Sequence, residues 1–510
     1  MFEGIAPALS ALVDLRIVGF VILGSLIGLV AGVLPGLGNV QAMAVALPFT
    51  FGMDRLAALY FLCSIAASST FGGSVPAILL NIPGTPANAA TTIEGYPMAK
   101  RGEANRALAI SATASALGGL VGIVVLIAAI PVVRLLTLAF GPPETFMLVL
   151  LGLVTIAYAV QRNVVRGLVT AGIGILISLI GYSQVTGVYR FSLGSPQYLW
   201  DGIQDVAFLI GVFGLSETIR YGLRGGAVAQ AGGITQEGFR GTLQGVIDVF
   251  HYPVTFARSC VVGAIVGIAP GIGGSVSNVV AYAMTAQLSK DPKIGKGSVE
   301  GLIAAETANN ATIGGDAVPT LAFGIPGSAA MAVLLGALTL HGVAVGPWLM
   351  KEHMEIVWVV VFGLVAGTLL SSLVGFFVAR WLARLTSTPM GLLVPVIVVL
   401  ILAGAFAVRQ NFWDMLVAIA SGVLGYVLIR CGFSLLPLII GFLLGAPAEL
   451  AFIQSLHISQ GSLLIFFTHP LSLALFLCAV AVGFYPLLQR RRARGLSAKP
   501  PSEQPRGAVR

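Results

Sequence analysis

Four Pro-Gly pairs interrupt apolar stretches of the chain, and polar side chains gather around each of them. The pairs are Pro35-Gly36, Pro83-Gly84, Pro270-Gly271 and Pro326-Gly327. Pro-Gly inside a membrane span frees backbone groups that lipid cannot satisfy, so such backbone is buried in protein or lines a watery cavity. The amides at the start of a helix carry a partial positive charge and suit a carboxylate. The pattern therefore predicts that the helix N-termini after these breaks hold a carboxylate near the middle of the membrane.

We predict that the residues flanking the breaks form one shared site for substrate and ion. The first half of the chain supplies Pro35, Gly36, Gly38, Asn39, Thr70, Gly72, Gly73, Ser74, Asn81, Pro83, Gly84, Thr85 and Asn88. The second half supplies Pro270, Gly271, Gly273, Ser275, Asn278, Asn309, Asn310, Thr312, Gly314, Gly315, Asp316, Pro326, Gly327 and Ser328. Small and hydroxyl residues also line ordinary contacts between membrane helices. Packing is therefore the alternative interpretation of each glycine, serine and threonine.

Two acidic residues lie near the second set of breaks. They are Glu306 and Asp316, and acids within membrane spans usually have a function. Freed carbonyl groups and hydroxyls suit a hard cation, so we expect Na⁺ near Thr312 and Asp316, or H⁺ as the coupling ion. The five histidines show no metal-ligand spacing. We therefore expect no resident metal or cofactor.

The composition shows what must position these residues. Of 510 residues, 57% are hydrophobic and 9% are charged, and apolar runs recur from Arg16 to Leu488. Each run is roughly 20 residues long, enough to cross a hydrocarbon core. The sequence predicts an all-α polytopic membrane protein with about 10–12 transmembrane, broken or re-entrant helices. The net charge of +8 needs no nucleic acid to explain it, because basic loops orient membrane proteins and contact anionic lipid.

The chain contains an internal repeat. "GVLPGLG" (32–38) and "TFGGSVPAILLNIPGT" (70–85) match "GIAPGIG" (267–273) and "TIGGDAVPTLAFGIPGS" (312–328) in order and spacing, apart from one extra residue. Duplicated halves with interrupted apolar segments are typical of secondary transporters. We predict a first transmembrane repeat at 1–221, a polar connection with a surface helix at 222–257 and a second repeat at 258–488. A basic, disordered cytoplasmic tail is predicted at 489–510.

The loop charges favour inverted repeats. Segment 100–106 contains three basic residues, whereas at the matching place in the second half Lys351 is offset by Glu352 and Glu355. Because cytoplasmic loops are rich in lysine and arginine, the first loop is predicted inside and its counterpart outside. A lysine cluster at 290–296 fits less simply, since some topologies would put it outside.

These motifs, together with the segment from Gly72 to Leu108, closely resemble the large membrane subunit of the tripartite tricarboxylate transporters, the TctA-type permeases. The resemblance covers nearly the whole chain. It implies a multi-pass permease of the bacterial inner membrane that works with a small four-helix membrane subunit and a periplasmic substrate-binding protein. Substrates of the family are small organic carboxylates such as citrate, and transport is coupled to an ion gradient.

Three alternatives differ from this interpretation. The first is a stand-alone ion-coupled carboxylate symporter that needs no binding protein. The second is a membrane-embedded enzyme, which would need a His, Asp or Glu constellation that the sequence does not show. The third is a passive channel. ATP hydrolysis is not expected, because "KIGKGSVEG" (293–301) lacks the residue order of a P-loop.

Overall fold

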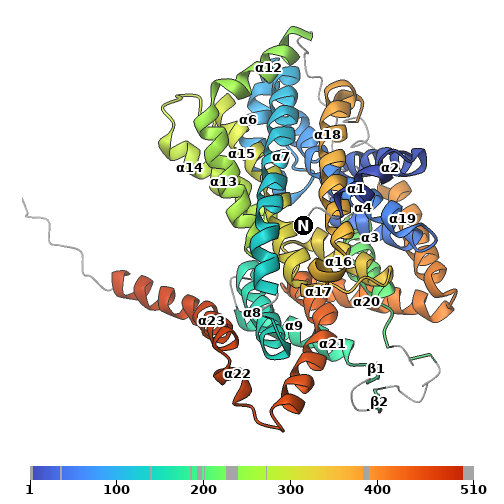
Figure 1. Ribbon diagram of the computed structural model, residues 1–510. Helices are drawn as coiled ribbons and strands as arrows, with labels where there is room; N and C mark the ends of the chain where they lie inside the picture. The colour runs from blue at the N-terminus through green and yellow to red at the C-terminus, as the bar shows by residue number, and fades with distance from the viewer. Residues whose placement is uncertain are drawn as a thin grey trace, which may run out of the picture.

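The protein is almost entirely helical. The computed structural model describes residues 4–34, 37–137, 140–161, 164–183, 187–191, 198–199, 202–224, 239–271, 273–382 and 390–497. Within these residues, helices form a bundle with one short antiparallel hairpin of strands β1 and β2 (Figure 1). The predicted all-α polytopic membrane class is confirmed.

The first half of the chain runs as far as helix α11. Its elements are α1 (Ile5–Ala11), α2 (Leu15–Val33), α3 (Asn39–Ala46), η1 (Leu47–Thr50), α4 (Arg55–Gly72), α5 (Ser74–Leu80), η2 (Pro86–Asn88), α6 (Ala89–Lys100), α7 (Ala104–Thr137), α8 (Pro142–Gln161), α9 (Val164–Ser178), β1 (Gly181–Tyr182), β2 (Tyr189–Arg190), α10 (Asp205–Leu209), the π-helical η3 (Ile210–Leu215) and α11 (Ser216–Arg224).

The polar connection contains one described helix, α12 (Phe239–His251). The elements after it are α13 (Pro253–Ile268), α14 (Gly273–Leu288), α15 (Val299–Phe323), α16 (Ala329–Leu340), α17 (Pro347–Glu352), α18 (Met354–Leu382), α19 (Met390–Arg409), α20 (Phe412–Arg430), α21 (Leu435–Ile458), α22 (Ile465–Thr468) and α23 (Pro470–Ser497).

Helix length and hydropathy separate complete spans from partial ones. Among the described residues, eight helical segments are long and apolar enough to cross a membrane. The pair Arg240–His251 and Pro253–Ile268 is bent by 77° and would add a ninth. Four further apolar helices are shorter, and α16 is one of them. The predicted count of about 10–12 included such broken helices.

Helices end at the Pro-Gly motifs in both halves. Helix α5 stops at Leu80 and η2 starts at Pro86, while α15 stops at Phe323 and α16 starts at Ala329. The other two breaks separate α2 from α3 and α13 from α14. Proline lacks the amide hydrogen that would continue the helix, which accounts for these ends. Pro35 and Gly36 lie outside the described residues.

Helices of the two halves pack against one another as well as within each half. Within each half, the first broken helix packs against the long buried one, α2 against α4 and α13 against α15. Across the halves, α7 packs against α15 and α18 packs against α4 (Figure 1). The breaks are therefore enclosed by helices from both halves of the chain.

The connection between α6 and α7 contacts the connection between α14 and α15. Arg101 Nη2 donates to the Gly297 carbonyl oxygen (2.8 Å), and the buried Glu94 carboxylate accepts from the amides of Gly297 and Ser298 (2.7 Å each). The lysine cluster at 290–296 thus lies on the same side of the molecule as the basic segment at 100–106. The lysine cluster is therefore compatible with the predicted placement of segment 100–106 inside.

The connection between α3 and α4 contacts the one between α16 and α17. His341 Nε2 lies 3.2 Å from Thr50 Oγ1, and Arg55 Nη2 at the start of α4 lies 3.9 Å from Glu355 Oε1 at the start of α18. In the repeat, α3–α4 corresponds to α14–α15 and α6–α7 to α16–α17. Each connection therefore contacts the non-equivalent connection of the other half.

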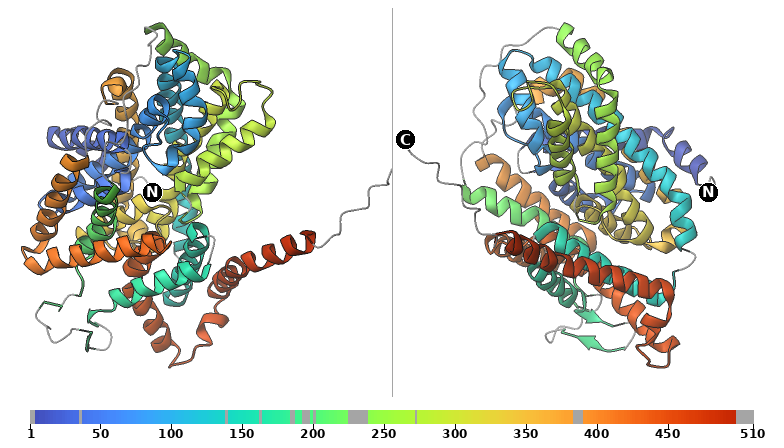
Figure 2. Two further views of the ribbon diagram at one scale, coloured as in Figure 1. Left: turned by 180° about the vertical axis from the view of Figure 1, so that it is seen from behind. Right: turned by 90° about the vertical axis from the view of Figure 1, so that its left-hand side faces the viewer.

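The C-terminal segment is more helical than predicted. Helix α23 packs against α8 and then extends away from the other helices as far as Ser497 (Figure 2). The prediction of a disordered tail from residue 489 is therefore wrong for 489–497. Four of the nine residues in this stretch are arginine, which favours a helix. Residues 498–510 lie outside the described part of the chain.

Candidate functional site

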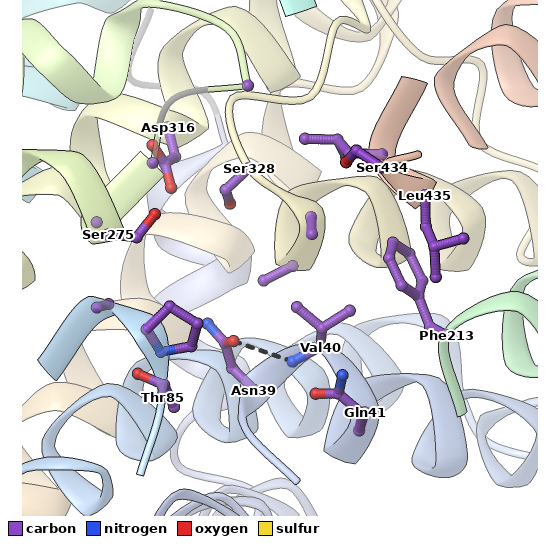
Figure 3. Close-up of a pocket in the computed structure, with 18 of the residues that line it drawn as sticks. Asn39, Val40, Gln41, Thr85, Phe213, Ser275, Asp316, Ser328, Ser434 and Leu435 are labelled. Carbon is purple, nitrogen blue, oxygen red and sulfur yellow. Dashed lines mark hydrogen bonds between the residues drawn. The ribbon is translucent and has the colours of Figure 1, made fainter. Parts of the chain in front are cut away.

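A cavity of about 430 Å³ lies where the broken helices of the two halves meet. Ten of the predicted site residues line it, seven of them from the second half: Asn39, Thr70, Thr85, Gly271, Gly273, Ser275, Asn309, Thr312, Asp316 and Ser328. Ser275, Asp316 and Ser328 lie on one side of the cavity, and Asn39, Val40, Gln41 and Thr85 form another wall (Figure 3). The volume lies within the range found for small-molecule sites.

Four helical segments begin at this cavity. Lining residues include Asn39 at the start of α3, Pro86 at the start of η2, Gly273 at the start of α14 and Ala329 at the start of α16. In the described part of the chain, no N-cap side chain accepts from the amides of α3 or η2. Within α3, the Val40 amide donates to Asn39 Oδ1 (3.0 Å), and within η2, Pro86 has no amide hydrogen. The other uncapped amides of a first turn keep their capacity to donate to an anion.

The second half supplies polar atoms that have no protein partner. Asn309 is 2% exposed and Asp316 is 5% exposed, so both side chains are almost fully buried. Among the described residues, the side-chain Nδ2 and Oδ1 atoms of Asn309 have no hydrogen-bond partner. The same is true of the Oδ1 atom of Asp316. Thr312 lies between them on α15, and its Oγ1 is 2.6 Å from Ser277 Oγ. Buried polar groups are normally satisfied, so these cavity-lining atoms are open to a water, an ion or a substrate.

The equivalent place in the first half is chemically different. Ser74 stands where the second half has Asp316, and its hydroxyl donates to the Glu306 carboxylate (2.9 Å). Asn88 joins the same network, because its Nδ2 atom donates to Ser74 Oγ (2.8 Å) and its Oδ1 atom accepts from Thr85 Oγ1 (2.6 Å). The hydrogen bonds of this network lie within the protein, and Asn88 is outside the cavity lining.

Glu306, the other predicted acid, does not line the cavity in the described structure. Its buried carboxylate accepts hydrogen bonds from Thr91 (2.6 Å), Ser74 (2.9 Å) and Ser115 (3.0 Å). These donors come from α6, α5 and α7, so the carboxylate joins α15 to three helices of the first half. Its contacts indicate a structural role.

Several predicted glycines lie behind the cavity and allow close backbone contact. A Cβ atom on Gly84 would lie 2.2 Å from the Gly32 carbonyl oxygen, and one on Gly327 would lie 2.5 Å from Asp316 Cα. The Gly271 amide donates to the Gly327 carbonyl oxygen (2.8 Å), which joins the two breaks of the second half. Only glycine fits at such distances.

The remaining described candidates are placed outside the lining. They are Gly38, Gly72, Gly73, Ser74, Asn81, Pro83, Gly84, Asn88, Pro270, Asn278, Asn310, Gly314, Gly315, Pro326 and Gly327. Asn81 is an exposed residue with φ 59° that ends α5. Asn278 donates to the Ala87 carbonyl oxygen, and Asn310 donates to Ser115 Oγ (2.8 Å). These residues support the breaks through packing and hydrogen bonds.

Comparison with known proteins identifies the family. Residues 18–440 match the tripartite tricarboxylate transporter TctA family. The chain belongs to the TctA family. It is 33% identical over 495 residues to an uncharacterized 52.8 kDa protein in the TAR-I ttuC' 3' region of Agrobacterium vitis, with 95% of this chain and 96% of the relative covered.

A second relative from Agrobacterium vitis is an uncharacterized protein in the TAR-II ttuC' 3' region. It is 33% identical over 235 residues, covering 45% of this TctA-family chain and 97% of the relative. No solved structure matches the chain. TctA is a transporter family, so the cavity belongs to a component of a tricarboxylate transporter.

The sequence did not reveal the other wall of the TctA-family cavity. Phe213, Ser434 and Leu435 lie across from Asp316 in Figure 3. Glu217 and Arg220 of α11 also line the cavity, and Arg220 Nε lies 2.7 Å from Glu217 Oε2. Both charges fall within the candidate span Asp205–Leu223, and this could have drawn attention to them.

Proposed function

We propose that this protein is the large permease subunit of a tripartite, binding-protein-dependent secondary transporter that imports small organic carboxylates of the tricarboxylate type. Transport is coupled to a Na⁺ or H⁺ gradient. The observation that carries the proposal is the convergence of four helix starts from both halves of the chain on one cavity.

The cavity chemistry suits a carboxylate. A helix start presents free amide donors and about half a positive charge, and two of the four starts have no side-chain cap. The hydroxyls of Thr85, Ser275 and Ser328 add neutral donors. A carboxylate is held by donors of this kind without a permanent cation beside each oxygen. The carboxylate can therefore also leave, as a transported substrate must.

The coupling ion has a separate set of groups on α15. Asn309, Thr312 and Asp316 are spaced three and four residues apart, which places them on one face of the helix. They offer amide, hydroxyl and carboxylate oxygens, the ligands that a hard cation such as Na⁺ prefers. Asp316 would alternatively carry the proton. The unpartnered atoms of Asn309 and Asp316 favour this face for the ion.

Orientation follows from the paired connections. The α6–α7 and α14–α15 connections lie together and are both rich in basic residues, so we place this side in the cytoplasm of a bacterial cell, with the protein in its inner membrane. The C-terminus is placed on the same side because of its basic tail. In this orientation the two halves are inverted relative to each other. We further propose an elevator-like motion, in which the helices that carry the breaks move relative to the remaining helices during transport.

The partners are those that the family resemblance implies. They are a small four-helix membrane subunit and a periplasmic binding protein that delivers the carboxylate. We predict that uptake of labelled citrate or tricarballylate into proteoliposomes requires all three proteins and exceeds equilibrium when a Na⁺ or H⁺ gradient is imposed. Full uptake by this chain alone would support the stand-alone symporter instead. Uptake that never exceeded equilibrium would overturn secondary active transport.

A further inference from the structure

One charged pair lies in the wall of the cavity. Arg220 and Glu217 are three residues apart on α11, and their side chains are 31% and 16% exposed. Arg220 Nη2 also lies 3.3 Å from Tyr221 Oη. Among the lining residues that the structure describes, Arg220 is the single side chain with a permanent positive charge.

Helix stability does not explain the pair. An ion pair at this spacing stabilises a helix only slightly, whereas charged side chains within a span are costly. Both residues lie within the candidate span Asp205–Leu223. A cost of this kind is usually retained where the charge binds a substrate or an ion.

Arginine can hold two carboxylates at once. Its guanidinium group has five N–H donors arranged in a plane, and Glu217 Oε2 lies against the Nε atom. Both terminal nitrogens therefore keep donors that can reach an oxygen in the cavity. Charge-assisted hydrogen bonds of this type are stronger than those from neutral donors.

We propose that Arg220 is a specificity-determining residue that binds the second carboxylate of substrates with two or more carboxylates. This inference rests on the proposed carboxylate transport. The helix starts hold the first carboxylate through neutral donors, and Arg220 holds the next one from the α11 wall. Glu217 offsets the charge of Arg220, so that a monocarboxylate gains little from it. The pair thus selects substrates by their number of carboxylates.

The test measures binding of three saturated probes to the purified full-length chain in lipid nanodiscs. Propionate, succinate and tricarballylate carry one, two and three carboxylates. R220Q should weaken the binding of succinate and tricarballylate about 10- to 100-fold, as expected for a lost charge-assisted contact, and change propionate binding less than twofold. R220K should restore part of the affinity. E217Q should tighten tricarballylate binding, because it removes a like charge from beside the anion.

R430Q is the matched control, because Arg430 is an exposed arginine at the end of α20, next to the lining residue Ile429. It should leave all three affinities unchanged. If R220Q weakened the binding of all three probes equally, or left the binding of all three unchanged, the proposed role of Arg220 would be overturned. The proposed carboxylate transport would not be affected by either result. A wild-type chain that bound none of the probes would overturn carboxylate transport and this inference with it.

Discussion

Replacing Asn88 by alanine tests whether the first-half network acts by holding a helix break in place. Asn88 is fully buried and makes three hydrogen bonds, to Thr85 Oγ1 (2.6 Å), the Thr70 carbonyl oxygen (3.1 Å) and Ser74 Oγ (2.8 Å). At about 0.6 to 1.5 kcal/mol for each bond, N88A should destabilise the protein by roughly 2 to 4.5 kcal/mol. Thermal unfolding of the purified protein should show this as a clear fall in Tm.

Transport should fall together with stability in this variant. Thr85 lines the cavity and depends on Asn88, so the start of η2 should move and substrate affinity should drop. The control is N81G, because Asn81 is exposed and has φ 59°, a conformation that glycine also adopts. N81G should leave both Tm and uptake unchanged. Loss of uptake in N88A with an unchanged Tm would refute the reasoning, since it would make Asn88 a direct ligand.

Three further predictions concern the ion site and the breaks. D316N should lower ion-driven uptake at least tenfold while substrate binding changes little, because Asp316 lines the cavity and belongs to the proposed ion site. The initial rate against Na⁺ concentration and against an imposed pH gradient measures this, and an unchanged dependence on both ions would contradict it. E306Q should lower the Tm without moving the midpoint of the ion dependence, since its three hydroxyl partners hold helices together. G84A should abolish uptake and reduce the amount of folded protein, because the added Cβ atom would lie 2.2 Å from the Gly32 carbonyl oxygen. The control is G19A, since no atom lies within 4 Å of the added carbon there. Uptake and Tm should both be preserved in G19A.

The helix breaks could be predicted from the sequence because their cause is local. Proline removes a helical hydrogen bond wherever it stands, so the ends of α5 and α15 follow from Pro83 and Pro326 and their neighbours. The sequence also predicted the chemical difference between the halves, because the repeat places Ser74 of the first half at the position equivalent to Asp316 of the second. Charge counting raised the question of an inverted repeat. The contacts between the connections then showed which loops lie together.

The other wall of the cavity could not be predicted, because it depends on contacts between distant segments. Phe433 and Ser434 belong to a turn between α20 and α21 that has no motif, and only the folded chain brings them near α3 and α16. The different surroundings of Glu306 and Asp316 also depend on tertiary contacts. Both are acids on α15, but the hydroxyls of Thr91 and Ser115 donate hydrogen bonds only to Glu306. Spacing along one helix does not distinguish a satisfied carboxylate from one that faces a cavity.

Cysteine labelling at the cavity tests the central claim most directly. Cys431 and Cys478 are exposed and would be replaced by serine, whereas Cys63 and Cys260 are buried and serve as an unreactive background. Ser275 lines the cavity, so S275C should react with a small charged thiol reagent. We predict that tricarballylate slows this reaction, and that it does so more strongly with the coupling ion present. Labelling at an unchanged rate, in a preparation that transports tricarballylate, would contradict a carboxylate site between the broken helices.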